Sequence, residues 1–201
     1  MNTEKKSEDL ANNTKEIESV FEEGKVKFFR MSQNYNNYLR RIDHKIEMSH
    51  KEGKSRPSVS VGIMLNGINY IIPLTSQYDS NWNNQMTFKV KELQKQSDDS
   101  YKEVVISCLK INNMHPALES ELEYIDFEKQ TNEKYKRLLF AEYDYIKNNI
   151  EVVTKKATQV YKKVTKSKLA VFVDNSVDFS KLESEYNKYD PSLIYEAPER
   201  S

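Results

Sequence analysis

The side chains of this chain that could do chemistry gather where predicted strands end. The stretch PLTSQYDSNW, residues 73–82, follows an apolar hairpin and presents hydroxyl, amide, phenol, carboxylate and indole groups with no glycine. Hydroxyls and amides can hydrogen-bond to phosphate or base edges, aromatic rings can stack on unpaired bases, and cationic side chains can neutralise phosphates. The combination favours contact with single-stranded RNA. For any one of these side chains, the alternative is an ordinary strand-end loop rich in turn-forming residues.

Groups of the same kind end or flank other predicted strands. Lys89 and Lys91 share one face of the next strand, because side chains alternate along a strand. His115 closes a later strand, either as a proton-transfer group or as a structural residue beside Pro116. The set of polar and stacking groups at strand ends is Arg56, Thr75, Ser76, Tyr78, Trp82, Lys89, Lys91, Asn112, Asn113 and His115. A lone tryptophan such as Trp82 is either a stacking platform or part of the core.

The sequence argues against several other kinds of site. No GxxxxGK[ST] or GxGxxG motif occurs, and four glycines leave little scope for a phosphate-cradling loop. One cysteine and three histidines, without HExxH or CxxC, argue against a zinc site. A Ser/His/Asp triad built on Ser76 lacks the GxSxG turn. Glu119, Glu121 and Glu123 are interpreted as solvated helix-face carboxylates.

Length and composition predict one domain with a lean core. The chain has 201 residues, of which 37% are hydrophobic, and no stretch resembles a membrane span or a secretory signal. Net charge is zero, but residues 25–60 carry nine Lys/Arg against three Asp/Glu, and residues 134–168 carry ten against three. These basic segments could line a groove for a polyanion, or they could be solvated helix faces. Cys108 lies in an apolar run, so we expect a buried, inert thiol in a reducing cytoplasm.

The elements that must position these groups begin with a strand and a helix. Residues 25–31 read as a short strand, and Ser32 is the predicted N-cap of a helix whose apolar residues recur as far as Ile46. Arg40 and Arg41 lie on or beside the polar side of this helix. The basic loop 50–57, which includes Lys54, leads into the next strand.

The middle of the chain predicts an antiparallel sheet. Two β-rich runs flank Asn66-Gly67, which predicts a tight hairpin because both residues tolerate positive φ. Residues 86–93 and 103–111 add further strands, joined by a polar link.

After Pro116 the apolar spacing becomes helical. Leu118, Leu122 and Ile125 predict a short first piece, and later apolar residues as far as Val164 predict one long helix. LAVFV, 169–173, is either a strand or a buried turn, and SVDFSKLESEYNKY predicts a last short helix. This order of elements favours an α+β fold over a parallel doubly wound sheet. We expect a helical appendage or a flexible extension in residues 1–25, one domain in 26–190 and a tail in 191–201.

An ordered series of segments resembles the ToxN/AbiQ toxins, the protein halves of type III (RNA-antitoxin) toxin–antitoxin and abortive-infection systems. The resemblance runs from Lys27 to about Tyr189. It is carried by KFFRMSQNYNNYLRRIDHKI, VGIMLNGINYIIPLTS, Trp82 with the amides after it, the Phe88-Lys89 pair, LKINNMHPA and VDFSKLE.

The resemblance implies a cytoplasmic endoribonuclease that needs no metal or other cofactor and that takes part in phage defence. The implied fold is a twisted antiparallel sheet or partly open barrel, similar to the Kid/MazF toxins, surrounded by helices that include a long one in the C-terminal half. The implied partners are cellular or phage RNA as substrate and a small pseudoknotted RNA as antitoxin, which is assembled with the toxin into a closed heteromeric ring. The implied reaction is attack of an RNA 2′-OH on the adjacent phosphodiester, which leaves a 2′,3′-cyclic phosphate.

Two departures from the family pattern bear on the site. Family members commonly carry a lysine two residues after the serine of Thr-Ser, where this chain has Tyr78, and a tyrosine of the preceding loop has no counterpart in residues 50–57. The roles of the family's catalytic residues therefore carry over at Thr75 and Ser76. We hypothesise that Lys89 or Arg56 supplies the positive charge of the missing lysine and that Tyr78 supplies the missing phenol. The predicted catalytic residues are Thr75, Ser76, Tyr78, Lys89 and His115, and the predicted RNA-binding residues are Arg40, Arg41, Lys54, Arg56, Trp82, Lys91, Asn112 and Asn113.

Two alternatives from other functional classes stay open at this point. One is an RNA-binding module without catalysis, which the missing lysine favours. The other is a helical protein-interaction scaffold that uses residues 118–166, although the hairpin and the basic loop count against it.

Overall fold

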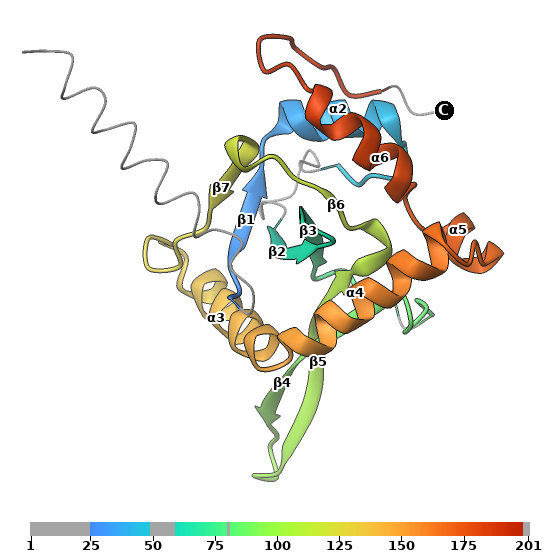
Figure 1. The fold of residues 1–201 in the computed structure, drawn as a ribbon. Coiled ribbons are helices and arrows are strands. Elements are labelled where there is room, and N and C mark those ends of the chain that lie inside the picture. Colours follow the sequence, from blue (N-terminus) through green and yellow to red (C-terminus); the bar gives the residue numbers. More distant parts are fainter. Residues whose placement is uncertain (1–24, 49–58, 80, 199–201) are drawn as a thin grey trace, which may run out of the picture.

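A computed structural model describes residues 25–48, 59–79 and 81–198. Its centre is an antiparallel sheet in the order β4-β5-β3-β2-β1-β7, with the short strand β6 (His115–Pro116) paired to β3. The predicted α+β fold with a twisted antiparallel sheet and surrounding helices is confirmed, and the sheet is open (Figure 1). The predicted N-terminal helix within residues 7–23 lies outside the described residues.

The N-terminal elements follow the predicted capping and turn signals. Strand β1 (Phe28–Met31) leads into α2 (Gln33–Ile42), where the Ser32 side chain accepts a hydrogen bond from the Tyr35 N–H. The helix ends before Ile46, because the backbone of Asp43 is extended. Ile46 is nevertheless buried in the core from the loop that follows.

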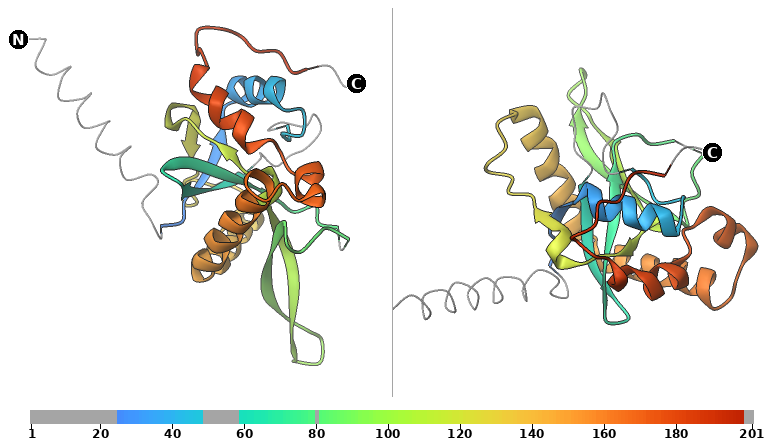
Figure 2. Two further views of the ribbon diagram at one scale, coloured as in Figure 1. Left: turned by 45° about the vertical axis from the view of Figure 1, so that its right-hand side comes forward. Right: turned by 90° about the horizontal axis from the view of Figure 1, so that it is seen from above.

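The predicted hairpin is β2 (Val59–Leu65) and β3 (Ile68–Thr75). Its two turn residues have positive φ, 53° at Asn66 and 77° at Gly67, as a type I′ turn requires. Strands β4 (Thr87–Lys95) and β5 (Tyr101–Lys110) form a second, longer hairpin, with a bulge at Val90/Lys91. The half of this hairpin beyond the bulge projects from the body as an arm (Figures 1 and 2).

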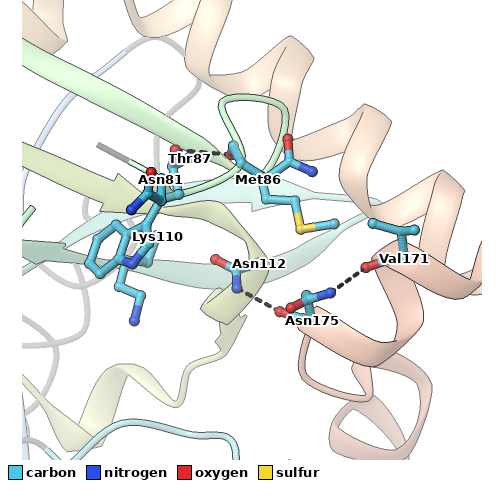
Figure 3. A pocket seen from close by; sticks show the side chains of 9 residues that line it. Asn81, Met86, Thr87, Lys110, Asn112, Val171 and Asn175 are labelled. Atoms are coloured by element: carbon cyan, nitrogen blue, oxygen red, sulfur yellow. Dashed lines mark hydrogen bonds between the residues drawn. The ribbon is translucent and has the colours of Figure 1, made fainter. Parts of the chain in front are cut away.

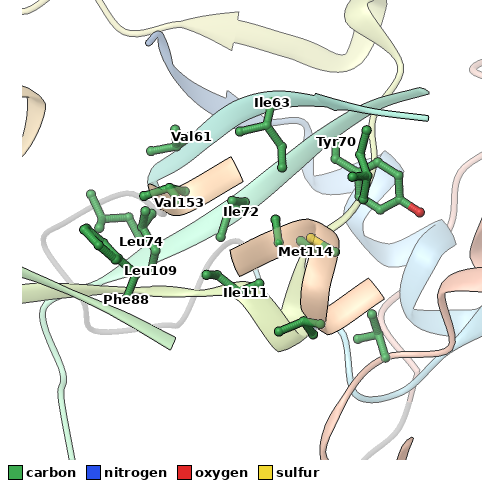
Figure 4. Close-up of a cluster of buried hydrophobic side chains, with 14 of the residues drawn as sticks. Val61, Ile63, Tyr70, Ile72, Leu74, Phe88, Leu109, Ile111, Met114 and Val153 are labelled. Carbon is green, nitrogen blue, oxygen red and sulfur yellow. The ribbon is translucent and has the colours of Figure 1, made fainter. Parts of the chain in front are cut away.

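One face of the sheet packs against the helices and forms the main core. Paired residues such as Leu74, Leu109 and Phe88 point to this face, together with Val61, Ile63 and Ile72 (Figure 4). Helices α3 (Glu133–Asn148), α4 (Ile150–Thr165) and α6 (Phe179–Glu185) cover the core, and α4 inserts Val153 into it. None of the helices in the described ranges is long and apolar enough to cross a membrane.

Two helical predictions after Pro116 need correction. The predicted piece around Leu118, Leu122 and Ile125 is a 3-10 turn (Glu119–Glu121) followed by strand β7 (Leu122–Tyr124), which pairs with β1. Leu122 and Ile125 pack against different apolar clusters on opposite sides of the strand, so their spacing imitates a helix. The predicted long helix is two helices, α3 and α4, which meet at Asn149, where the backbone leaves helical geometry.

The last part of the chain also differs from the prediction. LAVFV forms most of a short helix, α5 (Ala170–Asn175), of which Phe172 is the buried residue. Residues 191–198 contain no helix or strand, but they pack on α2. The Tyr195 N–H donates a hydrogen bond to Asn34 Oδ1 of this helix at 2.7 Å. The predicted last helix is confirmed as α6, followed by a 3-10 turn (Tyr186–Lys188).

Candidate active site

A row of three residues crosses the ends of β3, β5 and β4 on the sheet face opposite the main core. Thr75 pairs with Cys108, and Cys108 pairs with Lys89. Directly paired residues of antiparallel strands point to the same face, so the Thr75 hydroxyl and the Lys89 ammonium share one face. Neighbouring strands lie about 4.8 Å apart, which separates the two outer Cα atoms by about 10 Å. A group the size of a phosphodiester can therefore be approached by both side chains.

Access differs sharply along this row. Thr75 and Lys89 are half-buried and Ser76 is exposed, whereas Cys108 between them is fully buried. Burial raises the pKa of the Cys108 thiol, so the sulfur stays protonated at neutral pH. The expectation of a buried thiol is confirmed.

The chain turns sharply immediately after Thr75. The Thr75 Oγ1 accepts a hydrogen bond from the Gln77 N–H at 3.2 Å, which closes a turn and leaves Ser76 at its exposed apex. Adjacent hydroxyls on such a turn can donate to the oxygens of one bound phosphate.

Two lysines and two aromatic rings form a continuous cluster beside the row. The Lys89 Nζ lies 4.9 Å from the centroid of the Tyr78 ring, and Tyr78 meets Trp82 edge to face at 6.4 Å. The Lys110 Nζ lies 4.8 Å from the centroid of the Trp82 indole and forms an ion pair with Glu47. Cation–π contacts of this kind hold rings and ammonium groups together. The structure thus brings Tyr78, Trp82 and Lys89, three predicted site residues, into one group.

His115 lies on the same sheet face but is sealed from solvent. It pairs with Ile71, and the residue is 2% exposed. The Nδ1 atom lies 2.8 Å from the Asn113 carbonyl oxygen, which can only accept, so Nδ1 carries the proton. Burial lowers the pKa of His115 to about 4, against smaller opposing effects of the Asn113 carbonyl and Glu47. The side chain is therefore neutral near pH 7 and out of reach of a ligand on the surface, which argues against the predicted catalytic role.

A pocket of about 390 Å³ opens beside Trp82, between residues 81–87 and α5 (Figure 3). Thr87 and Lys110, which pair with each other across β4 and β5, form part of its wall. Asn112 and, from α5, Val171 and Asn175 complete the opposite side. The predicted RNA-binding residues Trp82 and Asn112 thus line one pocket.

Two lysines of α4 hold the segment that carries Trp82. The Lys156 Nζ donates to the carbonyl oxygens of Asn84 at 2.7 Å and Thr87 at 2.9 Å, and burial lowers its pKa. The Lys163 Nζ donates to Gln85 Oε1 at 2.8 Å. At these two positions the basic segment 134–168 has a structural role. The sequence predicts either a groove for a polyanion or a solvated helix face, and neither interpretation includes this role.

Other predicted RNA-binding residues lie elsewhere. Arg41 stacks on Tyr195 of the C-terminal segment at 5.6 Å, and the Arg40 Nε donates to the Ile46 carbonyl oxygen at 3.2 Å. Lys91 lies on the arm and is paired with Glu103 at 2.6 Å, and Asn113 is buried. Lys54 and Arg56 lie outside the described residues.

Sequence reasoning missed Lys110 and the contribution of α5. A signal existed for Lys110, because it lies two residues after Cys108 in a predicted strand and must share the face of that residue. No such signal existed for Val171 and Asn175. The sequence predicts a strand or a buried turn for residues 169–173 and gives no indication that this segment lies near Trp82. Within the described ranges, no group of His, Cys, Asp and Glu side chains could hold a metal ion.

Comparisons with known proteins address the resemblance directly. The family model of the ToxN toxin of type III toxin–antitoxin systems matches residues 27–187. An endoribonuclease ToxN of Bacillus thuringiensis subsp. kurstaki is 35% identical over 170 residues, which cover 81% of this chain and 84% of that protein.

Two solved structures have the same fold. A type III toxin from work on selective inhibition by a non-coding RNA pseudoknot aligns with a TM-score of 0.69 at 32% identity, over 82% of this chain and 97% of that chain. AbiQ, a lactococcal anti-phage endoribonuclease, aligns with a TM-score of 0.64 at 24% identity, over 82% and 97% of the two chains, and supports the fold alone. From the match of the family model and the identity to a curated relative, this chain belongs to the ToxN family of type III toxin–antitoxin toxins and is an endoribonuclease.

Proposed function

We propose that this endoribonuclease cuts RNA at the Thr75–Lys89 row by attack of a 2′-OH on the adjacent phosphodiester, leaving a 2′,3′-cyclic phosphate and a 5′-OH. The observation that carries the proposal is the pairing of both residues with Cys108, because a hydroxyl and an ammonium, each partly exposed, then share one sheet face. The nucleophile belongs to the substrate, so the protein must orient the nucleotide and stabilise charge on the phosphoryl oxygens.

Each residue of the row has a distinct task in this reaction. Thr75 and Ser76 donate hydrogen bonds to the phosphate, and Lys89 neutralises the charge that develops on it. Lys89 takes the place of the lysine that family members carry after Thr-Ser. Tyr78, whose ring packs against the Lys89 ammonium at 4.9 Å, is the proton-transfer group. His115 stabilises the end of β6 and does not contact RNA.

The proposed partners follow from the family. A small pseudoknotted RNA is the antitoxin, in keeping with the pseudoknot inhibition described for the relative of known structure. Toxin and antitoxin assemble into a closed heteromeric ring, and the toxin acts on cellular or phage RNA in the cytoplasm during abortive infection. The buried, reduced Cys108 is compatible with that compartment.

The test is cleavage of labelled RNA by purified protein in EDTA, with the product ends identified by mass. The wild type is expected to give discrete fragments that end in cyclic phosphate. Ser76→Ala is expected to abolish cleavage and toxicity with an unchanged fold, while Ser100→Ala, at the exposed tip of the arm, is expected to match the wild type. Undiminished cleavage by Ser76→Ala would remove this hydroxyl from the mechanism, and retention of RNA without cleavage by the wild type would leave only a binding module.

A further inference from the structure

We propose that the ion pair of Lys110 with Glu47 positions the aromatic rings beside the proposed cleavage row and does not itself bind RNA. Lys110 holds the Trp82 ring, and that ring holds Tyr78 against the Lys89 ammonium. Both members of the pair are therefore positioning residues, which reach the reaction only through other side chains. The inference rests on the proposed cleavage function and extends it to the residues that support the row.

Strand β5 places Lys110 on the sheet face of the row. Lys110 lies two residues after Cys108 in this strand, so both side chains point to the same face. The Lys110 side chain is 15% exposed, and in the described part of the chain its carboxylate partner is Glu47. Withdrawing an ammonium group from water is costly unless the group is paired. Glu47 therefore determines where this lysine can lie.

The backbone that carries the Glu47 carboxylate is anchored to α2. The Asn36 Nδ2 donates to the Glu47 carbonyl oxygen at 2.9 Å, and the Arg40 Nε donates to the Ile46 carbonyl oxygen at 3.2 Å. The side chain of Ile46 is buried in the core. The loop after α2 thus presents its carboxylate to Lys110 from a fixed position.

The Lys110 ammonium restrains the indole. Its Nζ lies 4.8 Å from the centroid of the Trp82 ring, within the range of about 6 Å over which an aromatic ring attracts a cation. The backbone of Trp82 is held in a turn, in which its N–H donates to the Asp79 carbonyl oxygen at 3.1 Å. Backbone bonds of this kind leave the two side-chain torsions of a tryptophan free. The contact with Lys110 therefore selects the orientation of the ring.

The indole passes this restraint to the cleavage row. The Trp82 and Tyr78 rings meet edge to face with centroids 6.4 Å apart, an arrangement that aromatic pairs prefer. The Tyr78 ring in turn lies 4.9 Å from the Lys89 Nζ. A misplacement of about 1 Å in a group that acts on the substrate can lower the rate by about 10²-fold. Loosening the indole is therefore expected to slow the reaction without removing a group that touches RNA.

Direct binding of a phosphate by Lys110 is the other use for this ammonium, and its surroundings disfavour it. A phosphate that approached Lys110 would also meet the Glu47 carboxylate, and like charges repel. Lys89, by contrast, forms no ion pair with an acidic residue in the described ranges, so its charge is available to the substrate. The two lysines thus have different tasks, one structural and one chemical.

The single tryptophan of the chain makes the ring directly observable in full-length protein without RNA. Lys110→Met and Glu47→Ala are each expected to raise the acrylamide quenching constant of Trp82 about twofold, because the ring moves more freely once the cation is lost or released. Lys110→Arg keeps a cation over the ring and is expected to match the wild type. An unchanged quenching constant in both Lys110→Met and Glu47→Ala would overturn the proposal.

Steady-state cleavage of labelled RNA measures the effect on the reaction. Lys110→Met and Glu47→Ala are each expected to lower kcat about tenfold and to leave KM within about twofold. The double variant is expected to be no slower than the slower single variant, because the two residues act as one unit. Lys110→Met leaves no unpaired charge, so the test stays available if Glu47→Ala does not fold. Losses that add in the double variant, or that appear only in KM, would contradict the proposal.

The route through the rings is tested in a Tyr78→Leu background. There Lys110→Met is expected to lower kcat by less than about twofold, because the ring that transmits its effect is already gone. The salt dependence of RNA binding is expected to be the same with and without Lys110. A further tenfold loss, or a salt slope that is shallower by about one, would mean that Lys110 contacts a phosphate directly and that the proposal is wrong.

A second ion pair supplies the matched control. Lys136 is 22% exposed and is paired with Glu128 at 2.6 Å, so Lys136→Met removes a similar pair and is expected to match the wild type in quenching and cleavage. If the wild type leaves product ends other than cyclic phosphate, the proposed chemistry fails, while the quenching measurements still decide whether the pair holds Trp82. If the wild type cuts as proposed and the pair variants change neither quenching nor kcat, this inference alone fails.

Discussion

The Thr75–Lys89 row and His115 occupy the same face of the sheet and differ in what covers them. The two places on β3 are four residues apart, from Ile71 to Thr75, or about 13 Å. At Ile71, Phe29 and Ala117 close the face with a small apolar cluster, and His115 is buried beside it. At Thr75 the chain turns into residues 76–86, and although Cys108 is buried there, Thr75 and Lys89 are partly exposed and Ser76 is exposed. Accessibility, more than the chemistry of the side chain, decides which polar residue can meet RNA.

Replacing the charge of the open row is expected to have the largest effect. Lys89→Met removes the ammonium that we propose faces the phosphate, and loss of one such group typically lowers the rate by about 10²–10³-fold. Lys91→Met is the matched control, because that lysine is paired with Glu103 on the arm. Single-turnover cleavage of labelled RNA measures both. Equal losses in the two variants would mean that Lys89 has no special role.

Removing the phenol of the open row is expected to have the next largest effect. Tyr78→Phe keeps the ring against Lys89 but cannot transfer a proton, so cleavage is expected to fall by about 10²-fold, at the low end for general acid–base catalysis. Tyr78→Leu also removes the contact with Trp82 and is expected to fall further. Full activity of Tyr78→Phe together with loss in Tyr78→Leu would reassign Tyr78 to positioning.

Changing the sealed histidine is expected to affect stability and barely affect cleavage. Folding lowers the pKa of His115 from 6.5 to about 4, so protonation favours the unfolded chain. Its contribution is fully present above pH 6.5 and is lost as the pH falls through 4, a change of about 3 kcal/mol at 1.36 kcal/mol per pKa unit.

His115→Gln is expected to remove that part of the pH dependence and to leave cleavage near pH 7.5 within a few-fold of the wild type. Urea unfolding at pH 7.5 and pH 4 measures the change in the free energy of unfolding. A steep loss of cleavage with an unchanged pH dependence of stability would restore the catalytic interpretation.

The features that the sequence predicts well depend on neighbouring residues. Ser32 caps α2 through a side chain three residues from its partner, and Asn66-Gly67 makes its turn with its own backbone. Strand alternation also puts Lys89 on the same face as Thr75 once the strands are paired.

The features that the sequence does not predict depend on contacts between distant segments. The pocket joins Trp82 to Val171, and nothing near either residue indicates the other. Leu122 and Ile125 pack on opposite sides of β7, so their helical spacing misleads until the partner strand β1 is known. The burial of His115 likewise requires β3, since only the pairing with Ile71 brings the apolar cluster over it.

The bulge at Val90/Lys91 divides the second hairpin into a base that carries Lys89 and an arm that projects from the body. Beyond the bulge, the arm carries exposed side chains such as Leu93 and Tyr101 and closes through a tip at Gln96–Ser100, where Gln96 N donates to the Ser100 carbonyl oxygen at 2.8 Å. Exposed loop tips of this kind accept insertions well. The arm is therefore a suitable place for an affinity tag or a fluorophore, which would let the toxin be captured or followed in cells while the face proposed to cut RNA stays unobstructed.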